Sequence, residues 1–267
     1  MKPRLFLIVL SLVLLALLIP PTGADTSAAI MPMPADTSGP PPAEAEYYIA
    51  EAKKAVADQN WTAAVFISTR GAAWYPQNAE ILCLQGYSYR KMGEYQRSVD
   101  IISRAIPLDP KAVRYANRGY GYLALKNYSA ALADAEAGIA LDAGYTTNYG
   151  VKALALQGMG RNAEAQEAIS TALAQAPDSA HYWHIKGKIL AAAGDCSGAQ
   201  AAFEKSLALD PVYVLPYPGF GNARGSLDTL GAACSPLPAQ TGSTKASLGC
   251  ASAIATALAV VALGMRR

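Results

Sequence analysis

The chain has 267 residues, of which 22 are basic and 20 acidic, so its formal net charge is +2. Four basic residues stand at the two ends (Lys2, Arg4, Arg266 and Arg267), which leaves 18 basic against 20 acidic residues between them, a net charge of −2. A mildly acidic chain lacks the basic surface that phosphate backbones require, so we expect no nucleic-acid partner.

The N-terminal segment has the composition of a secretory signal peptide. Lys2 and Arg4 precede an apolar run over residues 5–19, and two prolines and the small residues Thr22-Gly23-Ala24 follow it. We predict a signal peptide over residues 1–24 that is cleaved after Ala24; the alternative is an uncleaved anchor, although the run is short for a membrane span. Residues 25–42 are rich in Pro, Ala and Thr, which predicts a disordered linker.

Prolines mark a regular period in the middle of the chain. Pro76 and Pro110 are 34 residues apart, Pro110 and Pro177 are 67 apart, and Pro177 and Pro211 are again 34 apart. A period of 34 residues indicates stacked helix-turn-helix units. Within each unit large residues recur at three and four positions, and small residues stand where two helices must approach closely. A glycine such as Gly93 is suited to end the first helix.

The last unit shows the pattern most completely, as Trp183, Gly187, Leu190, Ala199, Phe203 and Pro211. It resembles the tetratricopeptide repeat, a helix-turn-helix unit with Trp, Leu-Gly, Tyr, Ala, Phe and Pro at these places, and the resemblance covers residues 43–211 in five copies. The resemblance implies an all-α fold, a right-handed α-solenoid whose first helices face its concave surface. One departure is systematic, because polar residues replace the leucine before the glycine. We expect their apolar stems along the helix interface and their polar heads in water; they are Glu51, Gln85, Arg118, Lys152 and Lys186.

The same resemblance implies which side chains line the concave groove. They are Lys53, Tyr87, Arg90, Lys91, Asn117, Tyr120, His181, His184 and Lys188. Tyrosines, amides and cations on a rigid wall suit an extended peptide or an acidic terminus. Chaperone-binding members of the family clamp a terminal carboxylate with a set of lysines and asparagines that this chain does not reproduce, so that function is not carried over.

Two N-glycosylation acceptor motifs occur, Asn60-Trp61-Thr62 and Asn127-Tyr128-Ser129. Both fall in predicted turns between paired helices. We therefore expect exposed acceptor sites at Asn60 and Asn127 if the repeats lie outside the cell.

The final repeat of a solenoid exposes an apolar face that needs a cap. We predict a C-terminal cap over residues 212–234, in which Leu227 and Leu230 cover that face. Cys196 lies in the turn of the last repeat and Cys234 at the end of the cap. A Cys196–Cys234 disulfide would attach the cap in an oxidising compartment, and two free thiols are the alternative.

The C-terminal end reads as a second hydrophobic segment. Residues 235–245 form a polar linker, and residues 246–265 carry no charge before Arg266 and Arg267. Such a run can span a bilayer with the arginines in the cytoplasm, which places the repeats outside. Residues 246–267 also resemble the sorting tails of archaeal and bacterial surface proteins, so a retained anchor and a processed tail both remain open.

Signatures of catalysis are missing from the sequence. We find no phosphate-binding loop, no HExxH motif and no paired-cysteine metal site. His181 and His184 share a helix face, but no third ligand accompanies them, so we predict no metal, cofactor or catalytic residue. We interpret the chain as an exported, surface-tethered scaffold that binds an envelope or secreted protein. The alternatives are an accessory subunit of an enzyme system that processes envelope polymers or glycans, and a spacer without a specific ligand.

Overall fold

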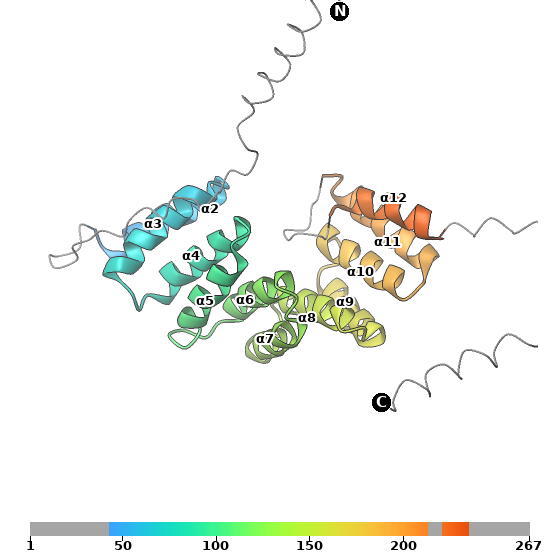
Figure 1. Ribbon diagram of the computed structural model, residues 1–267, viewed down its shortest axis with the longest axis horizontal. Coiled ribbons are helices and arrows are strands. Elements are labelled where there is room, and N and C mark those ends of the chain that lie inside the picture. The colour runs from blue at the N-terminus through green and yellow to red at the C-terminus, as the bar shows by residue number, and fades with distance from the viewer. Residues whose placement is uncertain (1–42, 213–220, 235–267) are drawn as a thin grey trace, which may run out of the picture. The chain divides into compact units, whose positions relative to one another are not determined.

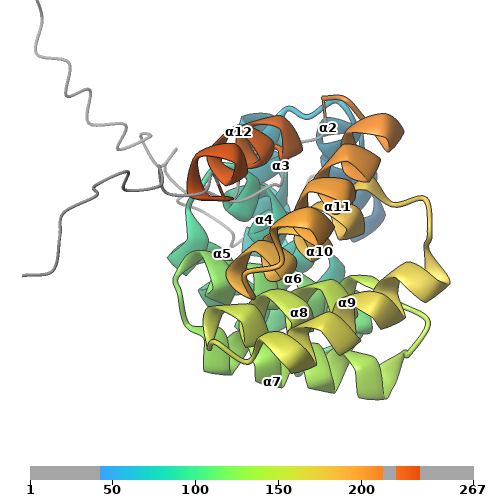
Figure 2. The same ribbon diagram turned by 90° about the vertical axis from the view of Figure 1, so that its right-hand side faces the viewer.

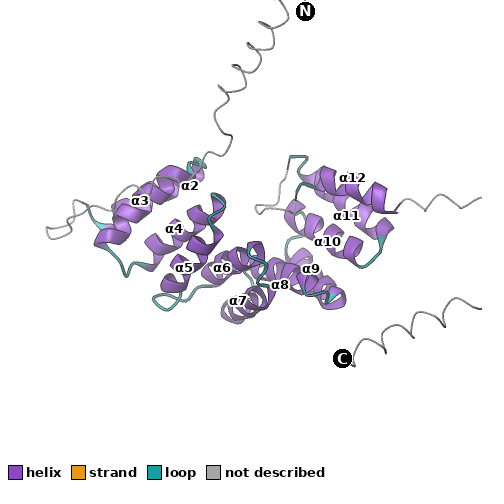
Figure 3. Ribbon diagram, viewed as in Figure 1, coloured by secondary structure: helices purple, strands orange, loops and turns teal. Residues whose placement is uncertain are grey.

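The computed structural model describes residues 43–212 and 221–234. Within them the chain forms eleven helices and no strand (Figure 1, Figure 3). The helices are α2 (Ala45–Ala57), α3 (Trp61–Trp74), α4 (Ala79–Lys91), α5 (Tyr95–Ala105), α6 (Ala112–Ala124), α7 (Tyr128–Leu141), α8 (Thr147–Gly158), α9 (Asn162–Gln175), α10 (Ala180–Ala192), α11 (Cys196–Leu209) and α12 (Ala223–Cys234).

Ten of these helices form five antiparallel pairs that follow one another along the chain. Each first helix packs against its own second helix, as α10 does against α11 (Figure 2), and each second helix packs against the first helix of the next pair. The first helices α2, α4, α6, α8 and α10 also contact one another in series. They therefore form one layer, and it is this layer that carries the predicted groove residues.

Left-handed residues end the first helices, as the sequence predicts at the glycines. The φ angles of Gly93, Gly160 and Gly194 are +86°, +76° and +83°, values that a residue without Cβ adopts freely. The other two pairs make the same turn with Gln59 (φ +55°) and Lys126 (φ +59°). The turn geometry is thus kept where the glycine is absent.

The small residues of the repeat pattern lie where paired helices touch. A Cβ atom added to Gly187 in α10 would lie 2.5 Å from the Phe203 ring in α11, and one added to Gly86 in α4 would lie 2.5 Å from Cγ1 of Ile102 in α5. These distances are shorter than any normal carbon contact, so each pair packs this closely only because the residue is glycine.

The polar residues that replace the pattern's leucine behave differently from our expectation. Gln85 is buried and donates from Nε2 to Oγ1 of Thr69 in α3 at 2.8 Å. Arg118 donates from Nη1 to Oγ of Ser103 in α5 at 3.0 Å. The expectation of heads in water is therefore wrong for these two residues, because each head finds a polar partner on the preceding second helix.

The last helix, α12, lies where the sequence predicts a cap. The compact unit that contains the repeats extends to Leu230. Leu230 is buried and Leu227 is half-buried, and Oγ of Ser226 lies 3.1 Å from Nε2 of His184 in α10. The start of α12 therefore packs against the last repeat.

No described helix is both long and apolar enough to cross a bilayer. The predicted signal peptide (1–24), both linkers (25–42 and 235–245) and the hydrophobic tail (246–267) lie outside the described residues. These four segments stay predictions.

Candidate functional site

Arg90 is a buried cation in the last turn of α4. Its guanidinium carbon lies 5.0 Å from the ring centre of Tyr87 and 5.2 Å from that of Tyr120 in α6. Its Nη2 donates to Oδ1 of Asn117 at 3.2 Å, whereas Nε and Nη1 are buried and bond to no atom of the described chain. Only 4% of the residue is exposed. A group that stays charged at all accessible pH values is thus held between two rings with few of its donors used.

Lys91 extends this arrangement toward the first repeat. Its Nζ lies 5.4 Å from the ring centre of Trp61 in α3 and 5.7 Å from that of Tyr87. The two rings meet edge to face with centres 6.0 Å apart. Burial lowers the pKa of Lys91, and the charge of Arg90 lowers it further. We call this group the Arg90 cluster: Trp61, Tyr87, Arg90, Lys91, Asn117 and Tyr120.

Tyr120 links the Arg90 cluster to the last repeat. Its hydroxyl lies 3.0 Å from Nε2 of His181 in α10, and the two rings meet edge to face. Between them in the layer lies α8, where a Cβ atom on Gly150 would come within 3.7 Å of Nε2 of His181. Burial, with smaller contributions from the charges of His184 and Arg90, lowers the pKa of His181 to about 3. His181 is therefore a neutral hydrogen-bonding group near neutral pH.

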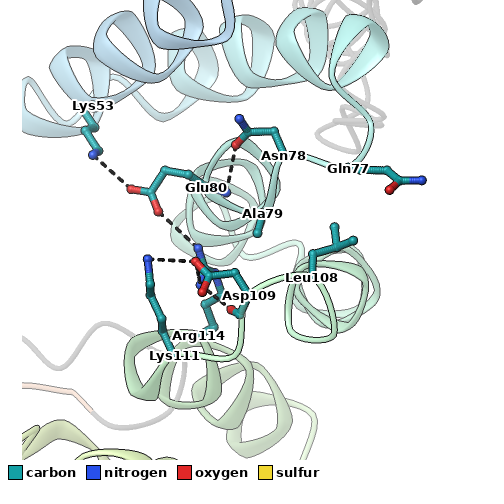
Figure 4. Close-up of a pocket in the computed structure, with 9 residues that line it drawn as sticks. All are labelled: Lys53, Gln77, Asn78, Ala79, Glu80, Leu108, Asp109, Lys111 and Arg114. Atoms are coloured by element: carbon teal, nitrogen blue, oxygen red, sulfur yellow. Dashed lines mark hydrogen bonds and ion pairs between the residues drawn. The ribbon is translucent and has the colours of Figure 1, made fainter.

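The predicted groove residue Lys53 lies in a separate pocket of about 540 Å³ (Figure 4). Its Nζ lies 3.0 Å from Oε1 of Glu80, whose other oxygen lies 3.4 Å from Nη2 of Arg114. Arg114, which is 1% exposed, also pairs with Asp109, and Asp109 pairs with Lys111. The charged side chains in this pocket largely neutralise one another. Lys53 therefore belongs to an ion-pair network and not to the Arg90 cluster.

His184 and Lys188 lie further along α10. His184 has no exposed surface and packs edge to face on Phe203, with its Nε2 at Oγ of Ser226. Burial and then the charge of Lys188 lower the pKa of His184 to about 4. Burial likewise lowers the pKa of Lys188, which is half-buried. His184 thus belongs to the packing of the last repeat, whereas the other predicted histidine, His181, faces Tyr120.

Both glycosylation acceptors cap second helices. Asn60 accepts from the amide of Ala63 at 3.1 Å, and Asn127 accepts from that of Ala130 at 3.2 Å, each through Oδ1. Both residues are exposed. A glycan attaches at Nδ2, and the capping bonds do not use this atom. Both acceptor sites thus lie on exposed turns, and their glycosylation stays a prediction.

Cys196 begins α11 and is disulfide-bonded. The side chain of Cys234 lies outside those that the structure describes. The pairing of the two therefore stays a prediction. Cys83 is a free thiol whose pKa is raised by burial.

Sequence reasoning missed Trp61 as a member of the site. It opens a second helix, where the repeat pattern predicts no groove residue, and only its edge-to-face contact with Tyr87 brings it to the cluster. Sequence reasoning also placed His181 and His184 on the same helix face.

Among the described residues, no three His, Cys, Asp or Glu side chains gather as metal ligands would.

Comparison with known families finds a match in two parts of the repeat region. Residues 79–111 and 151–214 each match a tetratricopeptide repeat model. Human serine/threonine-protein phosphatase 5 is 35% identical over 86 residues, which cover 32% of this chain and 17% of that protein. The small glutamine-rich tetratricopeptide repeat-containing protein 2 of Saccharomyces cerevisiae is 33% identical over 96 residues, which cover 36% of this chain and 28% of that protein. The chain thus spans less than a third of each of these curated relatives.

Solved structures agree with the family models at the level of the fold. A thermophilic TPR protein of Thermus thermophilus superposes with a TM-score of 0.59 at 16% identity, over 70% of this chain and 98% of that one. MamA from Desulfovibrio magneticus superposes with a TM-score of 0.53 at 23% identity, over 62% of this chain and 95% of that one. Residues 79–111 and 151–214 are therefore similar to tetratricopeptide repeats, and the helix pairs from α2 to α11 share the all-α solenoid fold of these solved structures.

Proposed function

We propose that the chain is a protein-binding scaffold whose partner contacts the layer of first helices at the Arg90 cluster. The observation that carries this proposal is a continuous series of side-chain contacts across the layer of first helices. Side chains from α3, α4, α6 and α10 meet there through ring and hydrogen-bond contacts. Repeats of this type are interaction modules, and a rigid surface rich in tyrosine and arginine is typical of binding hot spots.

The site supports binding better than it supports catalysis. The two histidines of the chain are neutral and face different neighbours, and two carboxylates near the first-helix layer, Glu80 and Asp109, are engaged in ion pairs. The likeness to phosphatase 5 covers 17% of that protein. We therefore propose no enzymatic activity for this chain.

We further propose that the scaffold works outside the cytoplasm and is tethered at the surface. The composition of residues 1–24 and 246–267 supports this location, as does the disulfide bond of Cys196, which persists best in an oxidising compartment. Mass spectrometry of the protein purified from its host tests it, because a mature N-terminus at Asp25 is expected. An N-terminus at Met1 together with recovery from the cytosolic fraction would refute it.

The binding role is tested by affinity capture with the tagged full chain from an envelope extract. We compare the parent with a Tyr87→Ala, Lys91→Glu variant, since both side chains are half-buried and can change without opening the core. The control is a Gln200→Ala, Lys205→Glu variant, which makes similar changes on the exposed surface of α11.

A protein recovered by the parent and the control but lost by the Tyr87→Ala, Lys91→Glu variant supports the proposal. Equal recovery by all three chains, at matched helix content, would contradict it. That result would favour a spacer or an accessory role in an enzyme system.

A further inference from the structure

Arg90 differs from Arg114, which is also buried, and from the half-buried Arg118 in having no carboxylate. Arg114 pairs with Asp109 at 2.8 Å and with Glu80, and Arg118 holds both oxygens of Asp134 at 2.6 and 2.8 Å. Among the described residues, Arg90 has one hydrogen bond, to the neutral amide of Asn117. The same fold thus supplies counter-charges to the guanidinium groups of Arg114 and Arg118 and leaves that of Arg90 uncompensated.

The uncompensated charge has a physical cost. A buried charge is stable only when it is paired or hydrogen-bonded, and a guanidinium carries five N–H donors. Two aromatic rings and a position in the last turn of α4 favour a cation there. They do not satisfy Nε and Nη1, however, so the site remains short of acceptors.

The second cation, Lys91, determines where a second negative group of a ligand would lie. Among the described ion pairs, none involves Lys91. Arg90 turns toward Asn117 and Tyr120 of α6, whereas Lys91 turns toward Trp61 of α3. The two cations therefore contact different neighbouring helices, which suits two separate carboxylates better than one.

We infer that the Arg90 cluster binds an acidic peptide segment, in which one side-chain carboxylate pairs with Arg90 and a second with Lys91. This inference rests on the proposed binding function and names the chemistry of its partner. Carboxylate oxygens accept from the planar fork of Arg90 in a way that no neutral amide of the ligand reproduces. The half-buried Tyr87 ring turns aside to admit the ligand, a rotamer change of the kind that is common at interfaces.

A direct test uses fluorescence anisotropy with the full chain and a labelled short peptide of alternating glutamate and alanine, amidated at its C-terminus. The comparison peptides carry glutamine in place of glutamate, one amidated and one with a free terminal carboxylate. We expect the glutamate peptide to bind the parent and the amidated glutamine peptide not to bind over the same concentration range.

The protein variants locate the site. Arg90→Gln and Arg90→Lys should each weaken binding of the glutamate peptide about tenfold or more. The first variant removes the positive charge, and the second keeps the charge but loses the planar fork of N–H donors. Lys205→Gln removes one exposed charge from α11 and should leave the affinity unchanged. Lys91 is half-buried, so Lys91→Gln should fold normally even if an Arg90 variant does not. Because it removes the second positive charge, it should weaken binding of the glutamate peptide several-fold.

Three outcomes would overturn the inference. They are equal binding of the glutamate and glutamine peptides, equal weakening by Lys205→Gln and Arg90→Gln, and binding only of the peptide with a free terminus. The proposed binding function can still be tested separately from the acidic ligand. A partner captured from the extract that is lost with Tyr87→Ala, Lys91→Glu but kept with Arg90→Gln would retain the scaffold while rejecting the acidic ligand.

Discussion

The hydroxyl of Tyr120 lies 3.0 Å from Nε2 of His181, and this contact joins α6 to α10 across the intervening helix α8. Residues 61 positions apart are thereby connected on one face of the solenoid. Gly150 of α8 lies beside this bridge, because a Cβ atom there would come within 3.1 Å of the Tyr182 ring and 3.7 Å of Nε2 of His181. A glycine that weakens helix α8 in isolation therefore lets the Tyr182 ring of α10 pack closely against it.

Replacing Tyr120 with phenylalanine should lower the free energy of unfolding by about 1 kcal/mol, because it removes a largely buried hydroxyl from His181 while keeping the ring over Arg90. Urea denaturation measures the difference. The control is Tyr47→Phe, at a tyrosine that is 57% exposed. Similar losses in both variants would mean that the Tyr120–His181 bond adds no stability.

Stability should depend on pH through His184. Its pKa falls from 6.5 to about 4 on folding, so the unfolded chain binds more protons between these values and the folded state loses stability as the pH falls. From pH 7 to pH 5 the loss from this residue alone should be about 2 kcal/mol. His181 adds to it in the same direction.

The check is the slope of unfolding free energy against pH in the parent and in His184→Gln. The variant should show the shallower slope whatever its absolute stability. Identical slopes would show that folding leaves the pKa of His184 unchanged.

The two left-handed turns without glycine should gain from one. Gln59→Gly and Lys126→Gly should each raise the free energy of unfolding by about 1 kcal/mol, because a side chain at φ +55° or +59° brings its Cβ close to the backbone. Gln59→Ala and Lys126→Ala keep that crowding and serve as controls. A glycine variant no more stable than its alanine counterpart would contradict the argument.

Arg118 and Asp134 should behave as one unit. Asp134 is 4% exposed, and burial raises its pKa while Arg118 opposes that shift. Arg118→Met leaves the carboxylate buried without a partner and should cost about 3 kcal/mol, whereas adding Asp134→Leu should restore most of the loss. A double-mutant cycle by urea denaturation measures the coupling, and additive effects would rule it out.

Local patterns were sufficient to predict the architecture. The proline period, the glycine turns at Gly93, Gly160 and Gly194, and the small residues at the helix contacts act within one repeat or between neighbours, so they can be read from the sequence. The predicted groove residues were placed only in part. His184 is on a first helix as expected, yet a residue 42 positions later, Ser226, covers it, and no repeat pattern predicts that contact.

The chemistry of the site depends on which groups stay unpaired, and this cannot be read from a single repeat. Arg90 and Arg114 look alike in sequence as cations on first helices. Their difference comes from Asp109 and Glu80, which reach Arg114 from the preceding repeat. Trp61 was missed for a related reason, since it approaches Tyr87 from a second helix.

The polar residues at the leucine position of the repeat make the junctions between neighbouring repeats differ from one another. Gln85 meets Thr69, Arg118 meets Ser103 and Lys152 meets Glu136, each on the second helix of the preceding repeat. One boundary is neutral, one joins a cation to a hydroxyl, and one is an ion pair. Exchanging the second and fourth repeats would set Lys152 against Thr69 and Gln85 against Glu136, so these repeats are not interchangeable modules.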